Sequence, residues 1–345
     1  MKSLSCFALW LFYFAISSAV SLASDRPNVI IILADDMGYS DIGAYGGEIE
    51  TPSLDSLAAN GMKFSRFYNS ARCCPTRASL MTGLHPHQTG IGWMTNPPET
   101  FKYDHGPDFP NYRGHLNRDC VTMAEVLKEN GYATILAGKW HLGMNKQDRW
   151  PLQRGFEKFY GCLAGATNFF YPEYPRGITE GNTFIENPES TTDRRYYTTD
   201  AFTDNAIRFI KEENTGKDRP FFLYLAYTSP HWPLHAHQVD VQKYVGKYKM
   251  GWDALREQRL KRQREIGLVD EDWKLSERSH MAWEEMDEAK KIEMDLRMAN
   301  YAAMIDRMDQ NIGNLVAFLE ETDQLDNELR VHKDQDGCLY DPKKY

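Results

Sequence analysis

The sequence predicts an α/β fold in which a central, largely parallel mixed sheet is flanked by helices. Continuous apolar runs occupy residues 29–34, 132–138 and 221–227, and such runs are typical of strands that are buried on both faces. Stretches with helical spacing separate these runs, and polar side chains follow each run at once. The alternation of strand and helix indicates parallel strands joined by crossover helices.

The helical stretches follow one another along the chain in the order that such a fold needs. Thr51 and Pro52 provide a cap and a first-turn proline for the first of them. Helical patterns then cover residues 121–130 and 203–213. Apolar side chains hold helical spacing over several turns across residues 301–319.

The net charge narrows the classes of function. The 345 residues include 40 Lys+Arg and 49 Asp+Glu, a formal charge of −9. Nucleic-acid binders usually carry a basic surface, so the acidic balance argues against that class. Apolar and charged residues occur in ordinary globular proportions, which excludes a disordered chain.

The first 23 residues have the pattern of a secretory signal peptide. Lys2 precedes an apolar run at residues 6–16, and small residues lead to a plausible cleavage site after Ala23. The apolar run is too short to cross a bilayer. We therefore expect a secreted or periplasmic protein with no membrane segment after cleavage.

The cysteines that remain after cleavage are odd in number. Cys6 is the only one of the six cysteines within the signal peptide, which leaves five. At least one of them is therefore expected to be a free or modified thiol. The five are Cys73, Cys74, Cys120, Cys162 and Cys338.

Chemically active side chains stand at the ends of the three predicted strands. Asp35 and Asp36 follow the first strand, Lys139 and His141 the second, and His231 the third. Ligands of open α/β sheets bind beyond the carboxyl ends of the strands. Paired carboxylates suit Ca²⁺ or Mg²⁺, and a lysine beside an imidazole suits an anionic substrate and a proton transfer. A solvated turn and structural histidines are the alternative interpretation.

The most specific segment is CCPTRASLMTG at residues 73–83. Its proline and terminal glycine predict a short helix with Cys73 at the amino end, where exposed N–H groups favour anions. Arg77 adds a permanent positive charge one turn later. The residues alone leave three interpretations open, namely a reactive cysteine, a buried structural cysteine or a disulfide partner.

This segment, Cys-x-Pro-x-Arg followed by Thr-Gly, resembles the signature of the formylglycine-dependent sulfatases of the alkaline phosphatase superfamily. The resemblance extends in order from residue 26 to about 327 and is greatest to the arylsulfatase branch. Its further motifs are RPNV (26–29), DD (35–36), GYSD (38–41), TPSLD (51–55), GKWHLG (138–143), GF (155–156) and PHWP (230–233).

The resemblance implies a modified nucleophile beside a metal ion. A formylglycine-generating enzyme would oxidise Cys73, and the hydrate of the product would attack the substrate. Asp35, Asp36 and the modified Cys73 would bind Ca²⁺, and Arg77 would steady the hydrate.

The resemblance also implies roles for the residues after the second and third strands. Lys139 and His231 would bind sulfate and assist the leaving oxygen, and His141 would hydrogen-bond the second hydroxyl. The implied reaction is hydrolysis of an aryl sulfate or a sulfated carbohydrate. A phosphate or phosphonate ester hydrolase of the same superfamily and a non-catalytic fragment are the alternatives.

The carboxyl end departs from the family pattern. We expect a catalytic domain at residues 24–327 and a divergent tail at 328–345, without the family's next buried strand and small subdomain. Charged residues in the tail predict that it stays unpaired. Gln335 and Asp336 stand where the family has two further calcium ligands. The loss of the family's two calcium ligands predicts low activity for this chain.

Overall fold

The computed structural model describes residues 26–95, 108–190, 195–213, 219–325 and 328–333. The expected signal peptide lies outside these residues, as do Cys338, Gln335 and Asp336. Within the described ranges, none of the helices combines the length and apolar character that a bilayer crossing needs.

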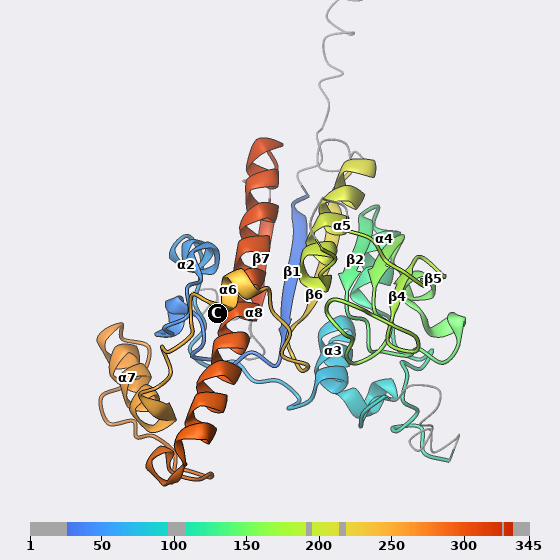
Figure 1. The fold of residues 1–345 in the computed structure, drawn as a ribbon. Coiled ribbons are helices and arrows are strands. Elements are labelled where there is room, and N and C mark those ends of the chain that lie inside the picture. The colour runs from blue at the N-terminus through green and yellow to red at the C-terminus, as the bar shows by residue number, and fades with distance from the viewer. Residues whose placement is uncertain (1–25, 96–107, 191–194, 214–218, 326–327, 334–345) are drawn as a thin grey trace, which may run out of the picture.

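A mixed seven-stranded sheet forms the centre of the described structure, with the strand order β5-β4-β3-β2-β6-β1-β7 (Figure 1). The five strands from β3 to β7 in this order run parallel, whereas β4 and β5 are antiparallel additions at one edge. The strands are β1 (Asn28–Asp35), β2 (Ala133–Gly138), β3 (Lys158–Gly161), β4 (Ile178–Glu180), β5 (Thr183–Ile185), β6 (Phe221–Pro230) and β7 (Glu328–Lys333).

Helices cover both faces of this sheet. Those of the first face are α2 (Pro52–Ala59), α5 (Thr198–Glu212), α6 (Gln238–Val241) and α8 (Glu288–Glu321). Those of the second face are α3 (Cys73–Thr82) and α4 (Met123–Glu129). A further helix, α7 (Gly251–Glu265), lies beside one end of α8, away from the sheet (Figure 1). Short 3-10 turns are η1 (Gly43–Tyr45), η2 (Pro86–Thr89), η4 (Gln147–Arg149), η5 (Pro151–Arg154) and η6 (Trp283–Glu285).

Strand β1 shows why apolar runs rather than alternating patterns predicted the sheet. Ile30 and Ile32 pack under the helices of the first face, whereas Ile31 and Leu33 pack under those of the second. Both sets of side chains are therefore buried, as expected for a parallel sheet with two covered faces. The predicted strands 29–34, 132–138 and 221–227 are confirmed as β1, β2 and β6.

The amino end of α2 is capped differently from the sequence prediction. Thr51 is at the N-cap position, but its hydroxyl accepts a hydrogen bond from the Gly43 backbone and makes no cap bond. The carboxylate of Asp309 on α8 instead accepts hydrogen bonds from the backbone N–H groups of Ser53 and Leu54, at 3.0 and 2.8 Å. A distant helix thus satisfies the free donors of α2.

Helices α5 and α8 are joined by a partly buried ion pair. The Arg307 guanidinium on α8 donates to Asp200 Oδ1 at 2.7 Å and to Asp200 Oδ2 at 2.6 Å. Asn311 adds a hydrogen bond to Asp200 Oδ1 at 2.8 Å. This fork-to-fork geometry fixes the two helices against one another.

The expectation that the tail stays unpaired is wrong for residues 328–333, and residues 334–345 lie outside the described structure. Glu328–Lys333 forms β7, which pairs in parallel with β1 in the register Asn28↔Glu328 to Leu33↔Lys333. We had compared this segment with a buried central strand, which needs apolar residues, and its charged residues did not fit that pattern. Within the described sheet, β7 is an edge strand, and an edge tolerates charged residues because backbone hydrogen bonds hold it in place.

Candidate active site

The candidate site lies where β1, β2 and β6 end and the amino end of α3 approaches them. Asp35 is the last residue of β1, and Pro230 of β6 is its register partner. Lys139 comes directly after β2, and His231 directly after β6. Adjacent parallel strands thus bring together side chains that are far apart in the sequence, as predicted.

Asp35 is buried between two cations. Lys139 Nζ lies 2.5 Å from Asp35 Oδ2, and an Arg77 guanidinium nitrogen lies 3.2 Å from Asp35 Oδ1. Burial alone would raise the pKa of Asp35, but the charges of Lys139 and Arg77 outweigh it and hold the pKa below its usual range. The carboxylate is therefore ionised at neutral pH.

Arg77 is held by one group that follows β2 and by one group on β6. Its guanidinium donates to the Lys139 carbonyl at 3.0 Å and contacts the Tyr224 hydroxyl at 3.2 Å. Sequence analysis missed Tyr224, a residue in the middle of β6. A hydroxyl within a fully buried strand needs a polar partner, and that requirement was the available signal.

Gly138 sets the direction of the chain just before Lys139. Its φ is +120°, and a Cβ at this position would lie 1.9 Å from the Ala226 carbonyl oxygen of β6. Only glycine permits this approach. The Lys139 N–H then bonds the same carbonyl at 2.7 Å, and the lysine side chain is buried toward Asp35.

Asp36 and His231 form the more open part of the site. His231 Nε2 lies 3.5 Å from Asp36 Oδ2, and the Asp36 side chain is 57% exposed. Burial and the neighbouring charge of Asp35 raise the pKa of Asp36. Asp36 also has a left-handed backbone with φ of +65°, which turns the chain sharply at the strand end.

Cys73 is the first residue of α3 and faces His141. Ligand atoms of Cys73, Cys74 and His141 all lie within 4.8 Å of one another. Hydrogen bonds with Cys74 and His141 and the charge of Lys139 hold the pKa of the Cys73 thiol far below its usual range, although burial acts against them. Burial raises the pKa of Cys74 and lowers that of His141. Of the neighbouring thiols, Cys73 is therefore the one ionised at neutral pH.

The structure brings the predicted site residues into one cluster. Asp35 contacts Arg77 and Lys139, Asp36 faces His231, and Cys73 lies beside His141. The described cysteines, Cys73, Cys74, Cys120 and Cys162, are all free thiols. Among them, only Cys73 combines partial exposure with a lowered pKa. The cluster thus contains an ionised thiol, two cations that flank a buried carboxylate, and two imidazoles.

Comparisons with known proteins agree with this arrangement. The sulfatase family profile matches residues 27–329. An uncharacterized sulfatase of Schizosaccharomyces pombe is 34% identical over 91% of this chain and 58% of its own length. An arylsulfatase of Klebsiella aerogenes is 35% identical over 91% of this chain and 67% of its own length. The chain thus spans little more than half of the first of these relatives.

A solved structure has the same fold. The crystal structure of Ps i-CgsB in complex with k-i-k-neocarrahexaose superposes with a TM-score of 0.61 and 26% sequence identity. The superposition covers 88% of this chain and 57% of that one. The architecture of the described sheet and helices is therefore that of an alkaline-phosphatase-like α/β protein.

Proposed function

The chain belongs to the sulfatase family, and from this membership and the site geometry we propose that it hydrolyses sulfate esters with a nucleophile made from Cys73. The observation that carries the proposal is the position of Cys73. It stands at the amino end of α3 beside His141. The same cluster holds a buried carboxylate between Arg77 and Lys139.

Oxidation of Cys73 to formylglycine by a formylglycine-generating enzyme is part of the proposal. One hydroxyl of the hydrate would attack the sulfur and become sulfated. The second hydroxyl would then lose its proton and re-form the aldehyde as the C–O bond to the sulfated oxygen breaks, which expels sulfate. A thiolate is a soft ligand, whereas the two neighbouring carboxylates are hard. When an oxygen replaces the Cys73 sulfur, all three proposed ligands of the metal ion donate through oxygen.

Asp35 and Asp36 fit a calcium ion. Asp35 Oδ1 is buried 3.2 Å from the Arg77 guanidinium, and among the described residues it has no partner of hydrogen-bond geometry, which leaves it able to coordinate a cation. The Asp36 carboxylate is more open, and both offer the oxygen ligands that Ca²⁺ prefers. A bound Ca²⁺ would favour the ionised form of an attacking hydroxyl. Asp35, Asp36 and the modified Cys73 would hold it.

The remaining residues bind, orient and move protons in this proposal. Lys139 and His231 would bind the sulfate group, and Arg77 would steady the hydrate and its charge. His231 stands at the open side beside Asp36, where it can give a proton to the leaving oxygen. His141, which is held neutral by burial, can accept the proton of the second hydroxyl.

We propose only a broad class of substrate and a secreted location. The substrate is a sulfate ester of an aryl alcohol or a carbohydrate. The proposed secretion rests on the leader pattern of residues 1–23. No role in nucleic-acid binding is proposed, because the net charge is −9.

The test compares wild-type protein, co-expressed with a formylglycine-generating enzyme, with Cys73→Ala and with Cys120→Ala as a buried-cysteine control. We expect kcat/KM for 4-nitrophenyl sulfate to fall by at least about 10³-fold in Cys73→Ala and to stay near wild type in the control. Mass spectrometry of the Cys73 peptide should show the change from thiol to aldehyde. Wild-type turnover by Cys73→Ala would refute the proposal.

Parallel assays with 4-nitrophenyl phosphate and a phenyl phosphonate ester separate the two ester classes. A kcat/KM that is higher for sulfate supports the proposal. Turnover of the phosphorus esters alone would assign the site to the alternative class.

A further inference from the structure

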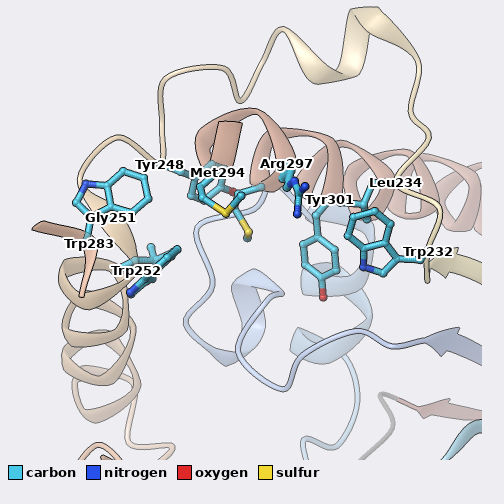
Figure 2. Close-up of a pocket in the computed structure, with 11 residues that line it drawn as sticks. Trp232, Leu234, Tyr248, Gly251, Trp252, Trp283, Met294, Arg297 and Tyr301 are labelled. Carbon is cyan, nitrogen blue, oxygen red and sulfur yellow. The ribbon is translucent and has the colours of Figure 1, made fainter. Parts of the chain in front are cut away.

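A separate cavity of about 330 Å³ lies between α7, α8 and the segment after His231. Apolar side chains line almost all of it. Figure 2 shows Trp252 and Trp283 on one side, Tyr301 and Trp232 on the other, and Met294 above the space between them. A cavity of about 150 Å³ lined by apolar side chains admits benzene, so this one has room for about two fused rings.

The wall formed by Trp252 and Trp283 is held in place by specific packing contacts. The two indoles pack edge to face with ring centres 5.3 Å apart. A Cβ at Gly251, whose φ is +84°, would lie 2.3 Å from Trp283 Cγ, so glycine is needed for the indole to pack there. The Asp253 carboxylate accepts a hydrogen bond from the backbone N–H of Trp283 at 3.2 Å, which ties η6 to the start of α7.

Helix α7 is fastened to the loop after β1. The Arg259 guanidinium donates to Asp41 Oδ1 at 2.7 Å and to Glu48 Oε2 at 2.8 Å. Tyr301 in turn donates to Asp41 Oδ2 at 2.6 Å. The cavity wall and the loop after Asp36 are thus held by the same set of polar contacts.

The cavity adjoins the candidate active site through two residues. The ring of Tyr301 lines the cavity, and its hydroxyl lies 3.2 Å from the Asp36 carbonyl oxygen. Trp232, which also lines the cavity and is 58% exposed, is the next residue in the chain after His231. One tyrosine side chain therefore separates the cavity from the backbone of a proposed calcium ligand.

We propose that this cavity binds the organic group of the sulfate ester, and that this group is an apolar, ring-containing alcohol such as a two-ring phenol. The inference rests on the proposed function and narrows its substrate. The lining offers mainly aromatic faces and thioethers, together with the guanidinium of Arg297, which lies over the Trp232 ring. A sugar, which needs partners for several hydroxyls, would find few of them there. A fused ring system would bury its faces against Trp252 and Tyr301.

Two variants change the cavity in opposite ways. Trp252→Ala removes an aromatic wall, and Met294→Trp fills the space between the walls. Trp273→Ala is the matched control, because Trp273 belongs to the same stretch of chain, is 45% exposed and does not line the cavity. Circular dichroism melting checks that each variant is folded.

The first measurement is calorimetric binding of 2-naphthol, which carries no sulfate and so reports on the cavity independently of catalysis. We expect Kd to rise about tenfold or more in Trp252→Ala and Met294→Trp, and to stay within about twofold in the control. Unchanged Kd in both folded cavity variants, or no binding to wild type, overturns the proposal.

The second measurement links the cavity to the reaction. The ratio of kcat/KM for 2-naphthyl sulfate to that for phenyl sulfate compares leaving phenols of similar acidity. We expect this ratio to fall about tenfold in both cavity variants. Hydrolysis of both esters with an unchanged ratio, or faster hydrolysis of glucose 6-sulfate than of 2-naphthyl sulfate, overturns the assignment of the cavity.

The two proposals fail in different ways. Naphthol binding that the cavity variants weaken, without hydrolysis of any sulfate ester, keeps an apolar-ring site and refutes the proposed function. A dimer in light scattering that Met294→Trp dissociates, without naphthol binding, assigns this face to a second copy of the chain and overturns the inference.

Discussion

Replacement of Arg77 by methionine tests whether the buried charge cluster holds the strand ends together. Methionine approximates the length of the arginine stem but removes the ion pair with Asp35 and the hydrogen bonds to Lys139 and Tyr224. Arg72→Met, at the N-cap of the same helix, is the control. Arg72 is exposed and lies over the Trp93 ring at 4.4 Å.

The burial of the ion pair between Arg77 and Asp35 determines how much stability the substitution should remove. Removal of one partner of a buried ion pair costs about 3–5 kcal/mol, because the remaining charge is left without compensation. Lys139 still neutralises part of the Asp35 charge, so we expect a loss of about 3 kcal/mol in the free energy of unfolding. An exposed cation–π contact such as that of Arg72 contributes about 0.5–1 kcal/mol.

Urea unfolding monitored by circular dichroism measures both variants on the same scale. We expect Arg77→Met to lower the midpoint well below that of Arg72→Met, with similar slopes. Equal and small losses in the two variants would refute the reasoning, since they would show that the buried cluster does not contribute more than a surface contact.

Three further predictions concern titration and helix capping. In protein produced without the modifying enzyme, alkylation of Cys73 should remain fast at pH 6 because its pKa is lowered; a rate that rises only near about pH 8.5 would contradict this. Asp309→Ala should cost about 1–2 kcal/mol of unfolding free energy, since it frees two N–H donors at α2, of which that of Leu54 is buried and that of Ser53 is partly buried; an unchanged urea midpoint would disprove the distant cap. Burial would raise the pKa of Asp200, but hydrogen bonds from His237 and Arg307 lower it below 3.8. The ion pair with Arg307 therefore stabilises the fold above about pH 3.8 and loses this effect as the pH falls. The unfolding free energies of wild type and Arg307→Met should accordingly converge in acid. A difference between the two that is independent of pH would contradict the assignment.

The sequence predicted the sheet centre and its chemistry because both depend on local patterns. Apolar runs mark strands that are covered on two faces, and the parallel topology then places the residues after each strand at one edge of the sheet. Asp35, Lys139 and His231 could be expected together on these grounds alone. Cys73 was found by its helix start and by the family signature.

Other parts of the site depend on contacts between distant segments, which local patterns do not encode. The bond from Tyr224 to Arg77 and the cap from Asp309 to α2 join residues far apart in the chain. The tail prediction failed at β7 for a related reason. There, β7 pairs with β1 through the backbone, and the side chains of the tail gave no sign of this pairing.

The positions of α7 and the central strands have a consequence for how the protein responds to heat. Asp35 ends β1 and Lys139 follows β2, two strands that are buried along almost their whole length, so we expect their hydrogen bonds to open only with the whole domain. Helix α7 buries only Gly251 and Gln263 of its fifteen residues. Warming should therefore loosen α7, and with it the cavity wall at Trp252, before the sheet. In the proposed reaction, the preference for ring-bearing esters would then be lost at a lower temperature than hydrolysis itself.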